Sequence, residues 1–116
     1  MLEKEFVPYE QALELKELGF DEECLGNFAD DEKYTLFTNG NRPGKIDAPT
    51  FSQAFRWFRE KYGLYSWITM ELGATLSFCW IITGENKSTE HKAFFKSYEE
   101  AELACLIKLI EIVKNK

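Results

Sequence analysis

A short phrase typical of helix starts occurs three times in this chain of 116 residues, at residues 9–12, 51–54 and 98–101. Each copy reads aromatic, polar, Gln or Glu, and then Ala. A Gln or Glu at the third helical position can accept a hydrogen bond from the backbone amide of the cap residue. Thr50 and Ser97 supply capping side chains for the second and third copies. The pattern therefore predicts three helices, of which the first, preceded by Val7 and Pro8, has the weakest start.

Glycine and hydrophobic periodicity set the extent of these helices. The first is expected over about 9–18, because Gly19 follows it, and the second over 51–62, because Gly63 follows it. The third is expected over 98–113. Its apolar residues cover an arc of about 200°, wider than the roughly 100° stripe of a surface helix. This third helix is therefore expected either to be deeply buried or to contact a partner.

Alternating and β-rich segments account for the rest of the chain. Residues 65–72 and 75–83 alternate with period two on either side of a Gly-Ala turn, and the second of these is apolar on both faces, as in a central strand. We also expect a hairpin from 24–28 and 33–38, an exposed loop over 38–45, a polar loop over 84–91 and a short edge strand over 92–95. The predicted fold class is α+β in the order helix, hairpin, helix, hairpin, helix. One domain, residues 1–116, would contain an antiparallel sheet of about four to five strands with helices packed mainly on one face.

Composition excludes several classes of protein. Hydrophobic residues make up 45% of the chain and aromatic residues 16%, so disorder is not expected. No apolar run approaches the roughly 20 residues that span a bilayer, and the first five residues do not resemble a secretory signal. We therefore expect a cytoplasmic protein without a membrane partner. Cys24, Cys79 and Cys105 are far apart and odd in number, which predicts buried thiols.

Charge is unevenly distributed along the sequence. The net charge is −6, which argues against general affinity for nucleic acid. Residues 1–32 hold eleven acids and two lysines, a net charge of −9, whereas residues 42–61 hold five cations and two acids, a net charge of +3. These segments are interpreted either as solvated faces or as an acidic region and a local basic site.

Few residues suit catalysis or metal binding. His91 is the only histidine, it lies in a predicted polar loop, and it is interpreted as a surface residue. Three adjacent acids at 30–32 lack the alternating ligands of a calcium loop. We therefore expect no catalytic residues, no cofactor and no metal. An enzyme built on scattered carboxylates stays open as a third class, because sequence alone does not show which acids come together.

One group of residues has the composition of a binding surface. Trp57, on the flank of the second helix, and the aromatic residues of the first long strand combine with nearby cations in a way that suits single-stranded nucleic acid. The same aromatics suit a protein interface or burial under another element. The candidate interaction residues are Arg42, Lys45, Arg56, Trp57, Arg59, Tyr65 and Trp67.

The second and third helices also carry a resemblance. Residues 48–64 and the capping segment at 97–102 with its apolar helix resemble small uncharacterised proteins of gut Bacteroidetes and their phages. The resemblance covers about a third of the chain. It implies a bacterial or phage cytoplasm and no known activity.

These observations lead to a non-catalytic interaction or accessory protein, expected to be a homodimer or to bind another protein through the third helix and some exposed aromatics. The alternative is a nucleic-acid-associated accessory factor that uses the basic and aromatic residues named above. The sequence gives no identity for a partner.

Overall fold

The computed structural model describes residues 2–29, 35–38, 46–85 and 87–115. The chain forms two compact units, Met1–Ala54 and Phe55–Lys116. Each unit has its own three-stranded antiparallel sheet. The α+β class is therefore confirmed, but the prediction of one sheet of four to five strands is wrong. A single domain over 1–116 stays a prediction.

The first unit begins with a short 3-10 helix, η1 (Leu2–Glu5), which the sequence did not indicate, followed by α1 (Tyr9–Glu17). Pro8 precedes α1 without a side-chain cap, as expected. At the other end Gly19 has a φ of 102°, and the amide of Phe20 donates to the carbonyl of Leu15 at 3.0 Å. This left-handed glycine ends the helix as predicted.

Three short strands complete the first unit: β1 (Gly26–Phe28), β2 (Leu36–Phe37) and β3 (Ile46–Ala48). The strand order is β2-β1-β3, and α1 contacts β3. Pairing of β1 with β2 confirms the predicted hairpin, whereas β3 was missed because it is only three residues long. The predicted turn around 30–32 and most of the predicted loop over 38–45 lie outside the described residues.

Helix α2 (Phe51–Tyr62) has the predicted bounds. The Thr50 hydroxyl accepts a hydrogen bond from the Gln53 amide at 3.2 Å, which satisfies one of the unpaired amides of the first turn. Gly63, with a φ of 64°, ends the helix and donates its amide to the carbonyl of Arg59 at 3.1 Å. The helix therefore starts and stops through local chemistry that is visible in the sequence.

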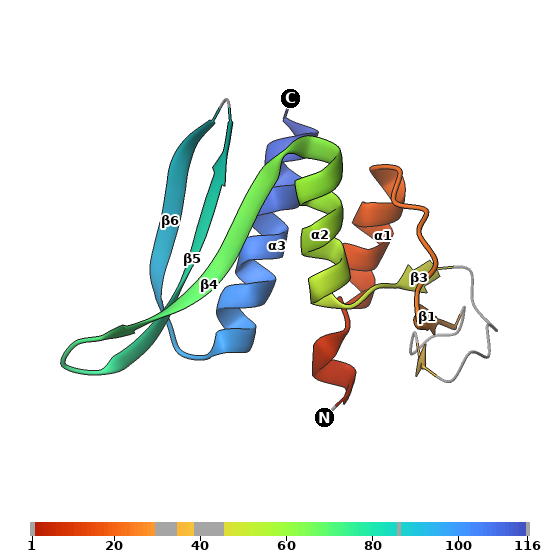
Figure 1. The fold of residues 1–116 in the computed structure, drawn as a ribbon. Helices are drawn as coiled ribbons and strands as arrows, with labels where there is room; N and C mark the ends of the chain where they lie inside the picture. The colour runs from red at the N-terminus through yellow and green to blue at the C-terminus, as the bar shows by residue number, and fades with distance from the viewer. Residues whose placement is uncertain (1, 30–34, 39–45, 86, 116) are drawn as a thin grey trace. The chain divides into compact units, whose positions relative to one another are not determined.

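The sheet of the second unit contains β4 (Leu64–Leu72), β5 (Leu76–Gly84) and β6 (Lys87–Phe95), in the order β4-β5-β6 (Figure 1). The central position of β5 is confirmed. The predicted loop over 84–91 is largely wrong, because most of it belongs to the nine-residue strand β6. Polar residues are tolerated there because β6 is an edge strand, with one side of its backbone unpaired within the sheet.

Helix α3 (Tyr98–Lys114) packs on this sheet. The Ser97 hydroxyl accepts from the Glu100 amide at 3.1 Å, and the Glu100 carboxylate accepts from the Lys96 amide at 3.2 Å. The first bond confirms Ser97 as the cap, whereas the second goes to the residue before the cap and not to the Ser97 amide that a capping box uses. Most of the wide apolar arc is buried, including Ala101, Cys105, Leu106, Leu109 and Ile110. Deep burial is therefore the correct alternative for most of this arc.

Candidate protein-interaction surface

The β4-β5-β6 sheet has one face covered by α3. The rings of Phe78 on β5 and Tyr98 on α3 meet edge to face at 6.3 Å. On β6, the Glu90 carboxylate lies 3.8 Å from the ammonium group of Lys108 on α3. Because side chains alternate along a strand, the residues between these positions point to the opposite face of the sheet.

That opposite face, here called the open face, contains Tyr65, Trp67, Thr69, Glu71, Ser77, Cys79, Ile81, Thr83, Thr89 and His91. Trp67, Ile81 and His91 form one row across the three strands. In the next row, the hydroxyls of Thr83 and Thr89 lie 2.9 Å apart. Tyr65 is 45% exposed and Trp67 is 48% exposed. The open face therefore presents two large aromatic side chains to solvent.

A second apolar group, the hairpin tip, consists of Met70, Leu72 and Leu76 at the turn between β4 and β5, with Leu72 83% exposed. Figure 1 shows this turn projecting away from α3. The sequence did not single out these residues.

Phe94 is a third exposed apolar residue, 85% exposed, with a φ of 72°. Phe78 pairs with Phe95 and Trp80 with Lys92, so β6 has one more residue than β5 between these pairs. The extra residue makes a β-bulge, and a bulky side chain in the left-handed region costs on the order of 1–3 kcal/mol. The bulge and the exposed ring both lie on the β6 edge.

The predicted interaction residues that the structure describes do not form one surface. Tyr65 and Trp67 do lie together on the open face. Trp57, however, is only 5% exposed, and its ring packs edge to face on Phe58 and Tyr62 at 5.1 Å and 5.4 Å. Of the two alternatives for Trp57, an exposed aromatic platform or burial, burial is therefore the correct one. The buried stripe of α2 is wider than its hydrophobic spacing indicated, because the indole ring reaches the core from the flank of the helix.

The two described cations of the predicted group lie on α2. Arg56 on α2 is 4.0 Å from Glu60 in an exposed i,i+4 pair, and Arg59 lies on the same helix. An exposed pair of this kind contributes little to stability. Arg42 and Lys45 lie outside the described residues. The open face itself contains no lysine or arginine.

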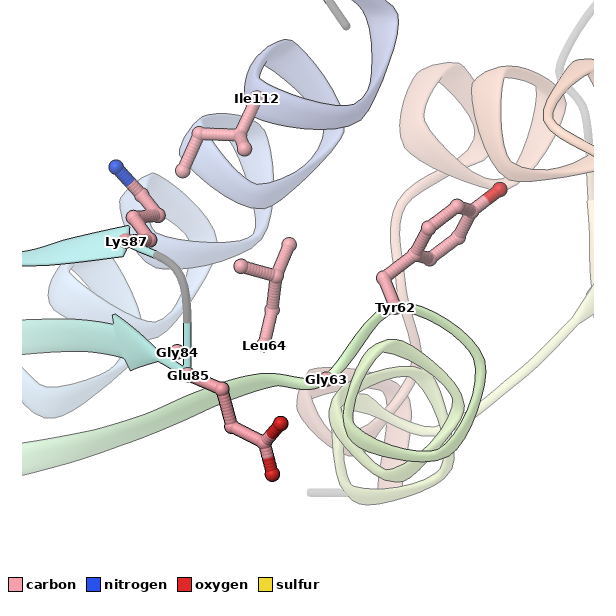
Figure 2. Close-up of a pocket in the computed structure, with 7 residues that line it drawn as sticks. All are labelled: Tyr62, Gly63, Leu64, Gly84, Glu85, Lys87 and Ile112. Carbon is pink, nitrogen blue, oxygen red and sulfur yellow. The ribbon is translucent and has the colours of Figure 1, made fainter.

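Described residues of the second unit line a smaller and a larger cavity. The smaller, about 260 Å³, is lined by Tyr62, Gly63, Leu64, Gly84, Glu85, Lys87 and Ile112. Figure 2 shows the side chains of Leu64 and Ile112 approaching each other from β4 and α3, with Lys87 beside them, whereas the Glu85 carboxylate points away. The described lining holds no serine, threonine, cysteine or histidine and only one carboxylate, that of Glu85.

The larger cavity, about 440 Å³, is a groove between β6 and α3. Its charged groups neutralise one another, because Glu90 pairs with both Lys87 and Lys108, and Lys108 also lies 3.3 Å from Glu111. The hydrogen bond from Lys87 lowers the pKa of Glu90, which favours the ionised carboxylate at neutral pH. No cluster of three or more metal-ligating side chains occurs among the described residues.

The three cysteines are buried thiols, as predicted. Burial raises the pKa of the Cys105 thiol to about 12, and the Glu102 carboxylate adds to this effect. The Ser66 hydroxyl approaches the thiol and opposes the rise in pKa, but the contact lacks the geometry of a full hydrogen bond. Burial also raises the pKa of Cys79. The raised pKa of Cys105 and of Cys79 favours the neutral thiol over the thiolate, and the thiol is the poorer nucleophile.

Comparison with known protein families, with curated proteins and with solved structures finds no match. The resemblance to small proteins of gut Bacteroidetes and their phages therefore stays a prediction. None of the described helices is long and apolar enough to cross a membrane.

Proposed function

We propose that this chain is a non-catalytic, self-associating interaction protein that makes its contact along strand β4, whose exposed residues belong to the open face and to the hairpin tip. The observation that carries the proposal is the exposure of Tyr65, Trp67 and Leu72 along a single strand. Large aromatic and aliphatic side chains of this kind are enriched in the buried centres of protein interfaces. A cytoplasmic location in a bacterium or phage-infected cell, as expected from the sequence, remains part of the proposal.

The chemistry of the open face favours a protein over a nucleic acid as the partner. Binding to a nucleic-acid backbone depends on lysine and arginine side chains, which the open face lacks. Its aromatics are flanked by Thr69, Thr83 and Ile81 in the same sheet. An alternative function as a nucleic-acid accessory factor would depend on Arg42, Lys45, Arg56, Arg59 and Trp67, without the buried ring of Trp57.

Sedimentation velocity over a range of protein concentrations tests the proposal. The sedimentation coefficient of the wild type should rise with concentration in the micromolar range. Leu72→Ser at the hairpin tip should weaken self-association about tenfold or more, because burial of a leucine side chain contributes roughly 1.5–3 kcal/mol. A particle that stays monomeric at high micromolar concentration would overturn the proposal.

The chain offers a matched control for this substitution. Leu25 in the first unit is 73% exposed, close to the 83% of Leu72. Leu25→Ser makes the same chemical change outside the proposed surface and should leave the sedimentation profile unchanged. An equal effect of both substitutions would indicate non-specific association through exposed apolar groups.

A further inference from the structure

The two edge strands of the second sheet differ in how they resist pairing with another chain. Edge strands in natural proteins are commonly protected by charged side chains and bulges. Strand β6 has both, since it contains Lys87, Glu90 and Lys92 and its pairing with β5 is irregular at two places. Strand β6 is therefore poorly suited to adding a further strand.

Strand β4 has neither protection. It pairs with β5 through nine consecutive residue pairs without irregularity, and Glu71 is its only charged residue. It contains no proline, and Tyr65, Trp67, Met70, Glu71 and Leu72 are all exposed. Among the described residues no strand pairs with its outer edge. A long, regular and nearly uncharged edge of this kind is a template for another strand.

We infer that the occupant of this edge is a second copy of the chain, whose β4 pairs antiparallel with the first β4 to join two three-stranded sheets into one of six strands. The inference rests on the proposed function, because it specifies how self-association occurs. A two-fold axis relates the two copies, as in most homodimers, and the same residues contribute from each side.

Symmetry restricts the register of this pairing. A two-fold axis perpendicular to the sheet keeps each residue on the same face in both copies, and directly opposed residues of antiparallel strands share a face. Odd-numbered residues of β4 must therefore oppose odd-numbered residues. Pairing over the full length of Leu64–Leu72 places the axis at Ile68, with Trp67 opposite Thr69 and Tyr65 opposite Glu71.

This register agrees with the charges and with the exposed side chains. The two Glu71 carboxylates lie at opposite ends of the new ladder, so no like charges face each other. Both copies of α3 fall on one face of the joined sheet. On the other face, the two open faces become continuous, with both copies of Trp67 next to the axis and the two copies of Tyr65 toward opposite ends of the ladder. The dimer therefore builds a larger aromatic surface from residues that each copy contributes.

Hydrogen exchange of the unmodified protein tests the location of the contact. Amides of residues 64–72 should gain protection when the concentration is raised across the range in which self-association occurs, whereas those of 87–95 should not. Equal protection of both edges, or protection of 87–95 alone, would overturn the inference. Because this measurement needs no substitution, it does not depend on the folding of a variant.

Cross-linking tests the register. Ile68→Cys places two thiols at the axis, and the roughly 4.5–5.5 Å between opposed Cα atoms lets a short bis-maleimide join them. Tyr65→Cys is the matched control on the same strand, because its two copies would lie six residues, about 20 Å, apart along the ladder. Rapid cross-linking of Ile68→Cys alone supports the inference, and equal or faster cross-linking of Tyr65→Cys overturns it.

The two proposals fail in distinguishable ways. If sedimentation shows no self-association, the proposed function is wrong. If the protein self-associates but residues 64–72 gain no protection, the interaction occurs at another surface, and only the β4 pairing is wrong.

Discussion

A Cβ atom added at Gly26 would lie 2.8 Å from Cε1 of Phe6 and 3.2 Å from the carbonyl oxygen of Ala48. Gly26 begins β1 and pairs with Ala48 of β3, while Phe6 is buried. The glycine is therefore required by a close approach of a ring and a neighbouring strand. This relationship fixes how the segment before α1 meets the small sheet of the first unit.

Gly26→Ala is expected to lower the free energy of unfolding by about 1–3 kcal/mol, because either the Phe6 ring or β3 must move. Chemical denaturation measures the change. Gly73→Ala is the control, since a Cβ atom at Gly73 meets no atom within 4 Å. A similar loss in both variants would show that the Phe6 contact is not the cause.

Ser66→Ala is expected to raise the free energy of unfolding by about 0.5–1 kcal/mol. The Ser66 hydroxyl is buried without a hydrogen-bond partner of full geometry among the described residues, and such a group carries a desolvation penalty. Ser88→Ala, at an exposed position of β6, should change stability very little. Destabilisation by Ser66→Ala would mean that the contact with the Cys105 thiol is favourable.

Cys105 is expected to make the fold less stable at alkaline pH. Its pKa is raised from an ordinary value of 9.0 to about 12 in the folded state, so above pH 9 the unfolded chain loses a proton that the folded chain retains. The contribution of the protonated Cys105 thiol to the free energy of unfolding is full below pH 9 and is lost as the pH rises toward 12. Between pH 8 and 10.5 the free energy of unfolding of the wild type should fall about 2 kcal/mol more than that of Cys105→Ala.

Denaturation at the two pH values checks this difference. Ile110→Val provides a control. It removes buried volume from the same helix without removing a titratable group, so its free energy of unfolding should depend on pH as that of the wild type does. If the free energy of unfolding falls equally with pH in the wild type and in Cys105→Ala, the extra loss of stability does not come from the Cys105 thiol.

Ser97→Ala is expected to cost about 1 kcal/mol, because it removes the acceptor for the Glu100 amide at the start of α3. Thermal or chemical unfolding followed by circular dichroism measures the loss. Ser52→Ala, at an exposed position in the first turn of α2, should be close to neutral. If the two variants are equally stable, the cap contributes nothing measurable.

The protein is expected to show no salt-dependent binding to a single-stranded oligonucleotide, because the open face lacks cations. Fluorescence anisotropy with a labelled oligonucleotide at low salt measures this directly. Binding that weakens with added salt and is lost in both Trp67→Ser and Arg59→Gln would instead favour the nucleic-acid alternative.

The local elements were largely predictable from sequence. Thr50, Ser97, Gly19 and Gly63 act on the turn in which they lie, so the bounds of the three α-helices follow from neighbouring residues. Alternation likewise predicted β4, β5 and the shared face of Tyr65 and Trp67. Strand β6 was missed because its polar residues are typical of a loop, and its strand structure depends on pairing with β5.

The candidate site was only partly predictable. The sequence grouped Tyr65, Trp67 and Trp57 and left open whether they are exposed or covered, and it overlooked Leu72 and Phe94. Burial of Trp57 depends on packing between residues, and exposure of Leu72 depends on where α3 ends relative to the hairpin. Neither relation is encoded in the spacing of a single segment.

The sequence by itself determined the three α-helices, the long β4–β5 hairpin and the buried state of the thiols, because capping, turn chemistry and hydrophobic periodicity act over a few residues. Only the tertiary structure decided that the strands divide between two sheets, that β6 extends over nine residues, and that the hairpin tip and one face of the second sheet stay uncovered. Those outcomes depend on pairing and packing between segments distant in sequence. A local sequence pattern does not contain the free energies of such contacts.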